Sequence, residues 1–394
     1  MWRALGRACS GLAYLVFLPL ACLWAGFASA GGPNAILPWP DNEGPLRRVV
    51  MQVAEDEADR ILPLLSTLLP QLQTTTEVEI VCASQVDQRR TMELVSALKL
   101  ERPERVRVHH FSAVETIWAR DRFLAGVDSR GAVCLLSPPE ASTALVGDFA
   151  VAGFLVGRHP NWQNRRSVLR LEGGDVLVGR KTILVGGTTV RRAGELYGPL
   201  SAADFNLLLG EDFNKNVVCV PEFERVEPVE GHLDYHLDMF ITWLHDDSVL
   251  LGDIDWGAEL AEKFLAEGGR LAGPPEEEEV NTSVPMEDIR ARLELARRAL
   301  VRAGIRVHRV PLYVIPDRGY FVTYNNMLQE ETPQGRIAYL PYYDASPLDR
   351  EAARVYSRHG YTVKWVDVRQ IYSLQGALRC VVNVVERGAP KQGL

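Results

Sequence analysis

Short apolar, β-rich runs alternate with amphipathic helical stretches along almost the whole chain, and this alternation limits the fold most strongly. Period-two and continuously apolar runs predict strands, whereas apolar residues at helical spacing predict helices. Strands are expected at 48–53, 77–83, 105–111, 176–187, 216–221, 236–244, 248–253, 306–314, 320–328, 336–343, 362–368 and 378–385. Helices are expected at 55–72, 87–100, 258–268, 286–304 and 347–360. The chain is therefore predicted to be an α/β protein.

The spacing of these elements suggests a repeated unit of a few strands and one helix, although no two units align in sequence. No low-complexity linker divides the chain. The acidic stretch at 273–283 is predicted to be a solvated loop. We therefore expect one catalytic domain from residue 31 to residue 394.

The first thirty residues have the order of a secretory signal peptide. Arg3 and Arg7 precede an apolar run from Leu12 to Phe27, and Ala-Ser-Ala ends at Ala30. A retained membrane anchor is the alternative, because the run is only slightly shorter than a spanning helix. Cleavage near Ala30 predicts a secreted or periplasmic protein with no stable membrane anchor.

Charge and cysteine content narrow the chemistry. The whole chain carries 43 Lys and Arg against 51 Asp and Glu, a net charge of −8, and signal cleavage removes two more arginines. An acidic exported protein fits a small cationic substrate better than nucleic acid. Cys82, Cys134 and Cys219 lie in apolar runs typical of buried cysteines, and the spacing predicts neither a disulfide scaffold nor a zinc site.

Cys380 differs from these cysteines, because the glycine-containing turn SLQGALRC leads into it. It is a candidate nucleophile, which requires a neighbour that favours the thiolate, although a structural cysteine is the alternative. The segment GHLDYHLDMF contains His-x-Asp twice, at His232 and Asp234 and at His236 and Asp238. In a strand each pair would place an acid/base beside a carboxylate, and metal binding or a solvated edge remains possible.

Three further motifs carry polar groups. In LEGGD, Glu172 and Asp175 bracket two glycines, which suits close approach to a ligand or simply a tight turn. In TIWARDRF, Asp121 follows Trp118 and could form an exposed ion pair with its arginine neighbour. TYNNML is expected to be a strand that carries Asn325 and Asn326.

Taken in order along the chain, Trp-x-Arg-Asp, Glu-Gly-Gly, His-x-Asp, Tyr-x-Asn and Gly-x-x-x-Cys resemble the guanidine-modifying, or pentein, superfamily. The resemblance runs from about Trp118 to Asn383 and is closest to the branch of agmatine deiminases and bacterial peptidylarginine deiminases. It implies a five-bladed α/β-propeller of ββαβ-type units around a polar site. It also implies roles for individual residues: Cys380 as nucleophile, His236 as acid/base, Asp121 and Asp238 as guanidinium carboxylates, Glu172 as support for substrate or histidine, Trp118 as a substrate contact and Asn326 beside the site.

The duplicated His-x-Asp leaves His232 and Asp234 as an alternative, and His236 is preferred because two strands follow it at the family's distance. Arg379 stands where the family often has a histidine, and the turn lacks the usual Gly-Gly. WARDRF lacks the Gly-Pro typical of agmatine deiminases, which together with export favours peptidyl-arginine over agmatine or free arginine.

The resemblance implies a hydrolase acting on C–N bonds of amidines. Cys380 attacks an arginine-like guanidinium, ammonia leaves, and a covalent thiouronium intermediate is hydrolysed to a ureido product. This chemistry needs no metal and no cofactor. The alternatives are an amidinotransferase and a non-catalytic secreted guanidine-binding protein. Oligomeric state and calcium dependence stay open.

Overall fold

The computed structural model describes residues 35–139, 146–198, 200–213, 215–220, 236–270, 286–315 and 319–389. The expected signal peptide at 1–30, the acidic loop at 273–283 and the alternative pair His232 and Asp234 lie outside these residues. Among the described residues, no helix is both long and apolar enough to span a membrane.

The described strands form five sheets. Within each sheet, neighbouring strands are hydrogen-bonded in the following order. The first contains β18 (Val382–Arg387), β2 (Leu46–Val53), β3 (Glu77–Cys82) and β4 (Val106–His110); the second contains β1 (Leu37–Pro38), β5 (Leu124–Val127), β6 (Val133–Ser137) and β7 (Gln163–Arg166). The third contains β10 (Asn216–Val220), β9 (Thr182–Gly186) and β8 (Val176–Val178); the fourth contains β11 (Ile241–Trp243), β12 (Val249–Asp253), β13 (Val307–Ile315) and β14 (Tyr320–Thr323). The fifth contains β15 (Leu328–Thr332), β16 (Gly335–Tyr342) and β17 (Tyr361–Asp367).

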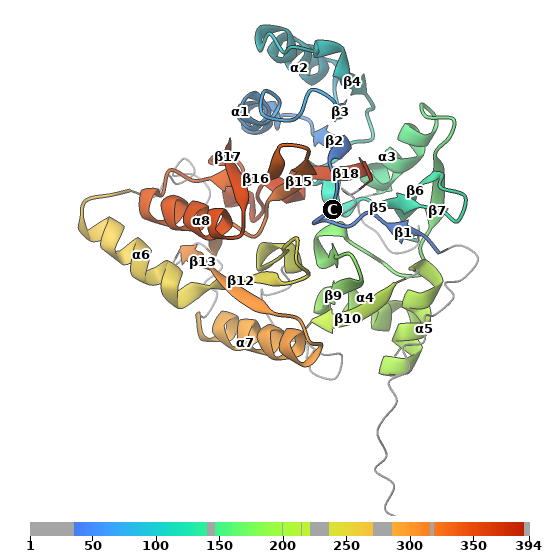
Figure 1. Cartoon of the computed structure of the whole chain (residues 1–394). Coiled ribbons are helices and arrows are strands. Elements are labelled where there is room, and N and C mark those ends of the chain that lie inside the picture. The colour runs from blue at the N-terminus through green and yellow to red at the C-terminus, as the bar shows by residue number, and fades with distance from the viewer. Residues whose placement is uncertain are drawn as a thin grey trace, which may run out of the picture.

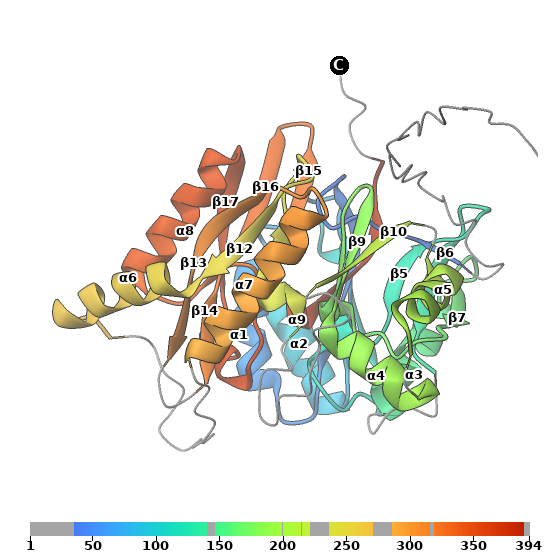
Figure 2. The same ribbon diagram turned by 90° about the horizontal axis from the view of Figure 1, so that it is seen from below.

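The helices of the described residues are α1 (Ala58–Leu68), α2 (Gln85–Ala97), α3 (Val146–Val156), α4 (Gly187–Tyr197), α5 (Ala202–Asp212), α6 (Ile254–Ala266), α7 (Met286–Arg302), α8 (Ser346–Arg358) and the short α9 (Leu378–Val381). Figure 1 shows the sheets arranged around a common centre, with the longer helices on the outside. Figure 2 gives the view at a right angle to this one, in which α6, α7 and α8 lie at one side of the molecule and α3, α4 and α5 at the other.

One connectivity recurs in all five sheets. An antiparallel pair is followed by a helical crossover to a parallel strand, because parallel neighbours cannot be joined by a tight turn. The pairs are β5–β6, β8–β9, β11–β12, β15–β16 and β18–β2, and the parallel partners are β7, β10, β13, β17 and β3. The first of these sheets joins the two ends of the described chain, since β18 pairs with β2. The expected α/β class is confirmed.

Three expected strands are wrong at one end. The strand expected at 378–385 begins only at Val382, because Leu378–Val381, which contains Cys380, forms the short helix α9. The strand expected at 236–244 begins only at Ile241, because Leu237–Met239 forms a 3₁₀ turn, η6, closed by hydrogen bonds from Met239 N to His236 O and from Phe240 N to Leu237 O. The strand expected at 320–328 ends at Thr323, and the two asparagines lie in the turn before β15. The site residues in the last two segments therefore lie in turns.

Three of the longer helices, α3, α4 and α5, were not expected from the sequence. The segment that forms α3, VGDFAVAGFLV, is apolar nearly all round and so lacks the one-sided pattern of an exposed helix. The segment that forms α4 begins with Gly-Thr-Thr, residues with weak helix preference, and its buried side chains instead pack it against the third sheet.

Candidate active site

Five short turns meet in the molecule, and each directly precedes the first strand of one repeated unit. Four are short helical turns: η2 (Ala119–Asp121) before β5, η4 (Gly173–Asp175) before β8, η6 (Leu237–Met239) before β11, and α9 before β18. The fifth is the turn at Asn325 and Asn326 before β15. Because α9 packs on η2, η2 on η4 and η4 on η6, motifs hundreds of residues apart share one site.

The thiol of Cys380 is held by Asn326, which is completely buried. Asn326 Nδ2 donates to Cys380 Sγ at 3.1 Å, and Asn326 Oδ1 accepts from the backbone N–H groups of Cys380, at 3.2 Å, and Arg379, at 2.8 Å. One amide group therefore fixes both the backbone and the sulfur of Cys380. This is a specific function for an asparagine that the sequence motif alone did not reveal.

The imidazole of His236 lies between two acids. Its Nε2 is 2.6 Å from Glu172 Oε2, and its Nδ1 is 3.5 Å from Asp121 Oδ1. Burial alone would lower the pKa of His236, but the charges of Asp121 and Glu172 outweigh burial and raise this pKa far above its usual value of 6.5. The same pairing lowers the pKa of Glu172, against the effect of burial. His236 is therefore an imidazolium at neutral pH.

Gly174 makes room for this imidazole. A Cβ atom at position 174 would lie 2.4 Å from His236 Nδ1, far closer than atoms in contact approach. The Gly174 N–H also donates to Asp121 Oδ1 at 3.0 Å, which leaves Asp121 Oδ2 without a hydrogen-bond partner among the described residues. The second glycine of LEGGD is thus required by the position of the histidine.

Two supporting residues of this group were not predicted to act. Arg192, on α4, forms an ion pair with Glu172 Oε1 and so leaves Oε2 for the histidine. Asp175 accepts hydrogen bonds from the backbone and the hydroxyl of Thr189, both at 2.8 Å, and burial raises its pKa to about 6. Arg192 gave no sequence signal because its helix was not expected, whereas Asp175 was visible in LEGGD.

Asp238 is fully buried and makes an ion pair with Arg379. Arg379 Nη1 donates to Asp238 Oδ2 at 3.0 Å, while Asp238 Oδ1 is buried and has no hydrogen-bond partner among the described residues. The other arm of the guanidinium, Nη2, donates to Asp41 Oδ2 at 2.8 Å. Asp238 therefore presents one oxygen, Oδ1, that no other group in the described part of the chain occupies.

Trp118 and Gly376 enclose the nucleophile. Trp118 belongs with Cys380 to one apolar cluster, and a Cβ atom on Gly376 would lie 2.4 Å from the Trp118 ring and 3.2 Å from Cys380 Cβ. Burial raises the pKa of the Cys380 thiol well above 9.0, and the charges of Asp238 and Asp121 raise it further. The thiol is therefore neutral in the unliganded protein, and both carboxylates interact with it electrostatically.

The expected ion pair between Arg120 and Asp121 does not form. Both residues are buried, and Arg120 donates to the carbonyl oxygens of Gly173, at 3.0 Å, and Val176, at 3.2 Å. In the described part of the chain, no group of three or more His, Cys, Asp or Glu side chains could hold a metal ion.

The structure thus brings together all the preferred site residues, Trp118, Asp121, Glu172, His236, Asp238, Asn326 and Cys380. A cation-binding pair of carboxylates, a buried thiol and an imidazolium in one place can bind a guanidinium and carry out nucleophilic substitution on it.

No protein-family model matches the sequence, and no curated protein matches it. The fold, however, matches many solved structures. The chain shares its fold with solved agmatine deiminases, so the resemblance expected from the motifs is confirmed at the level of the fold.

Agmatine deiminases are among the matched structures. An agmatine deiminase of Enterococcus faecalis aligns with a TM-score of 0.64 and 14% identity over 91% of this chain and 98% of its own. The agmatine deiminase of C. jejuni aligns with a TM-score of 0.60 and 16% identity over 90% of this chain and 97% of its own. A protein described as a candidate peptidyl-arginine deiminase aligns with a TM-score of 0.61 and 15% identity over 90% of this chain and 99% of its own.

Proposed function

We propose that this protein is a cysteine-dependent deiminase that hydrolyses an arginine-like guanidine to a ureido product and ammonia. The observation that carries the proposal is the convergence of Cys380, His236, Asp121 and Asp238 at the turns that precede the first strands of the repeated units. We further propose that the five sheets are the blades of an α/β-propeller whose axis passes through this meeting point.

Two carboxylate oxygens would hold the substrate. Asp121 Oδ2 and Asp238 Oδ1 have no hydrogen-bond partner among the described residues, and a guanidinium is a planar cation with N–H donors on each side. Trp118 would cover part of the substrate beside the thiol. Binding the cation removes the negative field that disfavours ionisation of Cys380, so the pKa of the thiol falls when substrate arrives. The thiol proton then passes to solvent, because His236 is already protonated.

The reaction would then proceed in two halves. The Cys380 thiolate forms a C–S bond to the guanidinium carbon, and the C–N bond breaks as the His236 imidazolium gives its proton to the leaving nitrogen, which departs as ammonia. In the second half, His236 takes one proton from water as the water oxygen bonds to the same carbon. The C–S bond then breaks, the second water proton passes to solvent, and the thiolate and the neutral ureido product are released. Glu172 stabilises the imidazolium throughout.

Substrate and location complete the proposal. Peptidyl-arginine, agmatine and free arginine share the guanidinium that these residues would bind. The basic and apolar start of the sequence leads us to propose export after cleavage near Ala30, and the N-terminal residue of the mature protein from its host tests this directly.

The activity is tested with ammonia release from the three substrates. Cys380→Ala should abolish ammonia release and leave the protein folded, whereas Cys219→Ala is the matched control. Burial raises the pKa of Cys219 to about 12, and it lies on strand β10 and not in one of the five turns. Retained turnover in Cys380→Ala refutes the assignment. If the protein were an amidinotransferase, an added amine would be converted to an amidino-amine product. If it were a non-catalytic binder, it would bind arginine without releasing ammonia.

A further inference from the structure

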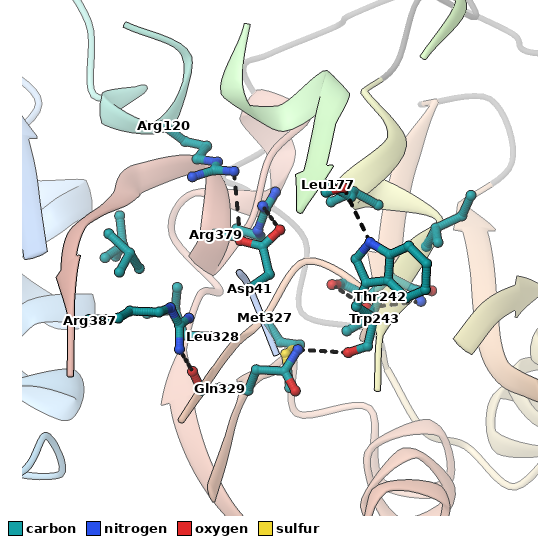
Figure 3. A pocket seen from close by; sticks show the side chains of 14 residues that line it. Asp41, Arg120, Leu177, Thr242, Trp243, Met327, Leu328, Gln329, Arg379 and Arg387 are labelled. Carbon is teal, nitrogen blue, oxygen red and sulfur yellow. Dashed lines mark hydrogen bonds and ion pairs between the residues drawn. The ribbon is translucent and has the colours of Figure 1, made fainter. Parts of the chain in front are cut away.

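Arg379 immediately precedes the nucleophile and is itself buried, with 5% of its surface exposed. Its guanidinium bridges two carboxylates from distant parts of the chain: Nη1 donates to Asp238 at 3.0 Å and Nη2 donates to Asp41 at 2.8 Å. Figure 3 shows Arg379 pointing into the cavity beside the site, where Asp41 lies between it and Arg120.

Asp41 anchors the far side of this bridge. Its Oδ2 also accepts from the Val178 N–H at 2.8 Å, and its Oδ1 lies 3.8 Å from Arg120. A lysine side chain ends in a single ammonium group, whereas the planar guanidinium of Arg379 contacts the carboxylates of Asp41 and Asp238 at once. The bridge therefore fixes the orientation of Arg379 and, through it, of Asp238.

Asp238 needs such a partner to remain ionised. The residue has no exposed surface, and one of its oxygens has no hydrogen-bond partner, so burial favours its protonated form. The charged groups that face it are Arg379 on α9, His236 on η6, and Asp121 and Arg120 on η2. Burial raises the pKa of Asp238, and Arg379 is the strongest group acting in the opposite direction.

We propose that Arg379 is a positioning residue that keeps Asp238 as a carboxylate and reserves a single oxygen, Oδ1, for the substrate guanidinium. This inference rests on the proposed function and adds a residue to its binding machinery. Asp238 then contacts the substrate through one hydrogen-bonded oxygen instead of a paired contact. Only a charged Asp238 attracts the substrate cation strongly, so substrate capture depends on Arg379 although Arg379 touches no substrate.

The sign of the pH effect follows from this arrangement. Without the positive charge of Arg379, the pKa of Asp238 rises further, so Asp238 is protonated over more of the neutral range and captures substrate poorly there. Raising the pH ionises it again. The acidic limb of kcat/KM, which reports ionisations of the free enzyme, must therefore move to higher pH when the charge is removed.

The test compares kcat/KM against pH for the wild-type protein, R379Q, R379K and D41N. R379Q keeps hydrogen-bond donors near Asp238 but no charge, and its acidic limb should move up by about one pH unit or more, equivalent to a roughly tenfold loss on the acidic side. R379K should return the limb toward its wild-type position. D41N removes the anchor but not the charge beside Asp238, so its limb should not move upward.

If the R379Q limb coincides with that of the wild type, or if R379K fails to restore it, the inference is overturned while the proposed function stands. A wild-type protein that turns over no guanidine refutes the proposed function, and this inference falls with it. A uniform loss at every pH in R379Q also overturns the inference, because a purely structural role would give that result.

Discussion

Replacing Gly174 by alanine should disable the histidine without removing any polar group. The new Cβ would lie 2.4 Å from His236 Nδ1, whereas ordinary contacts begin at 3.4 Å. The ring must therefore retreat by about 1 Å, and a misplacement of that size costs on the order of 10²-fold in rate. It would also break the 2.6 Å contact with Glu172. We expect kcat for ammonia release to fall about 10²-fold in Gly174→Ala.

The matched control is Gly194→Ala on α4, where an added Cβ meets nothing within 4 Å. This variant should keep full activity and gain up to about 1 kcal/mol of stability from the better helix preference of alanine. If Gly174→Ala acts through His236, adding it to His236→Ala should cost nothing further. Full activity in Gly174→Ala, or a further loss in the double variant, would refute the reasoning.

Three other changes test separate parts of the site. Asn326→Ala removes the donor to Cys380 Sγ and the acceptor for two backbone N–H groups. As for the loss of one oriented polar group, kcat should fall about 10-fold to 100-fold. An unchanged kcat would contradict the positioning of Cys380 by Asn326. Glu172→Gln removes one of the charges that raise the pKa of His236, so the imidazolium loses its proton at lower pH. The alkaline limb of the kcat–pH profile should therefore move to lower pH. A limb that stays in place would exclude His236 as the acid. Burial and two carboxylates raise the pKa of the Cys380 thiol, so its alkylation by iodoacetamide without substrate should still accelerate with pH beyond 9. Peptide mass spectrometry would follow the rate of alkylation. A plateau in this rate below pH 8 would disprove the neutral resting thiol.

Local patterns predicted the elements that the site is built on. The apolar runs that became β2, β3, β12 and β16 are continuous and end near their expected residues, because burial in a sheet requires such runs. The turn before Cys380 was visible from its glycine, and the structure adds that Gly376 packs against Trp118. The candidate site residues were chosen by the resemblance of the ordered motifs to a known family, since each motif alone has an ordinary structural explanation.

The contacts that organise the site could not be predicted from local sequence. Arg379 reaches Asp41 across 338 positions, and Arg192 reaches Glu172 from a helix that begins with residues of weak helix preference. The repeat was hidden for a similar reason. The units share a polar residue one to three positions before their first strand, as at Asp121, Asp175 and Asp238, but no longer stretch of common sequence.

The most direct test is to detect the bond between substrate carbon and sulfur. The protein would be mixed with an arginine-type substrate, quenched with acid during turnover, and examined by intact mass and peptide mapping. We predict an adduct of substrate minus ammonia on the Cys380 peptide alone, which disappears as substrate is consumed. Ureido product formed at the wild-type rate by Cys380→Ser, or an adduct on a different residue, would contradict the account.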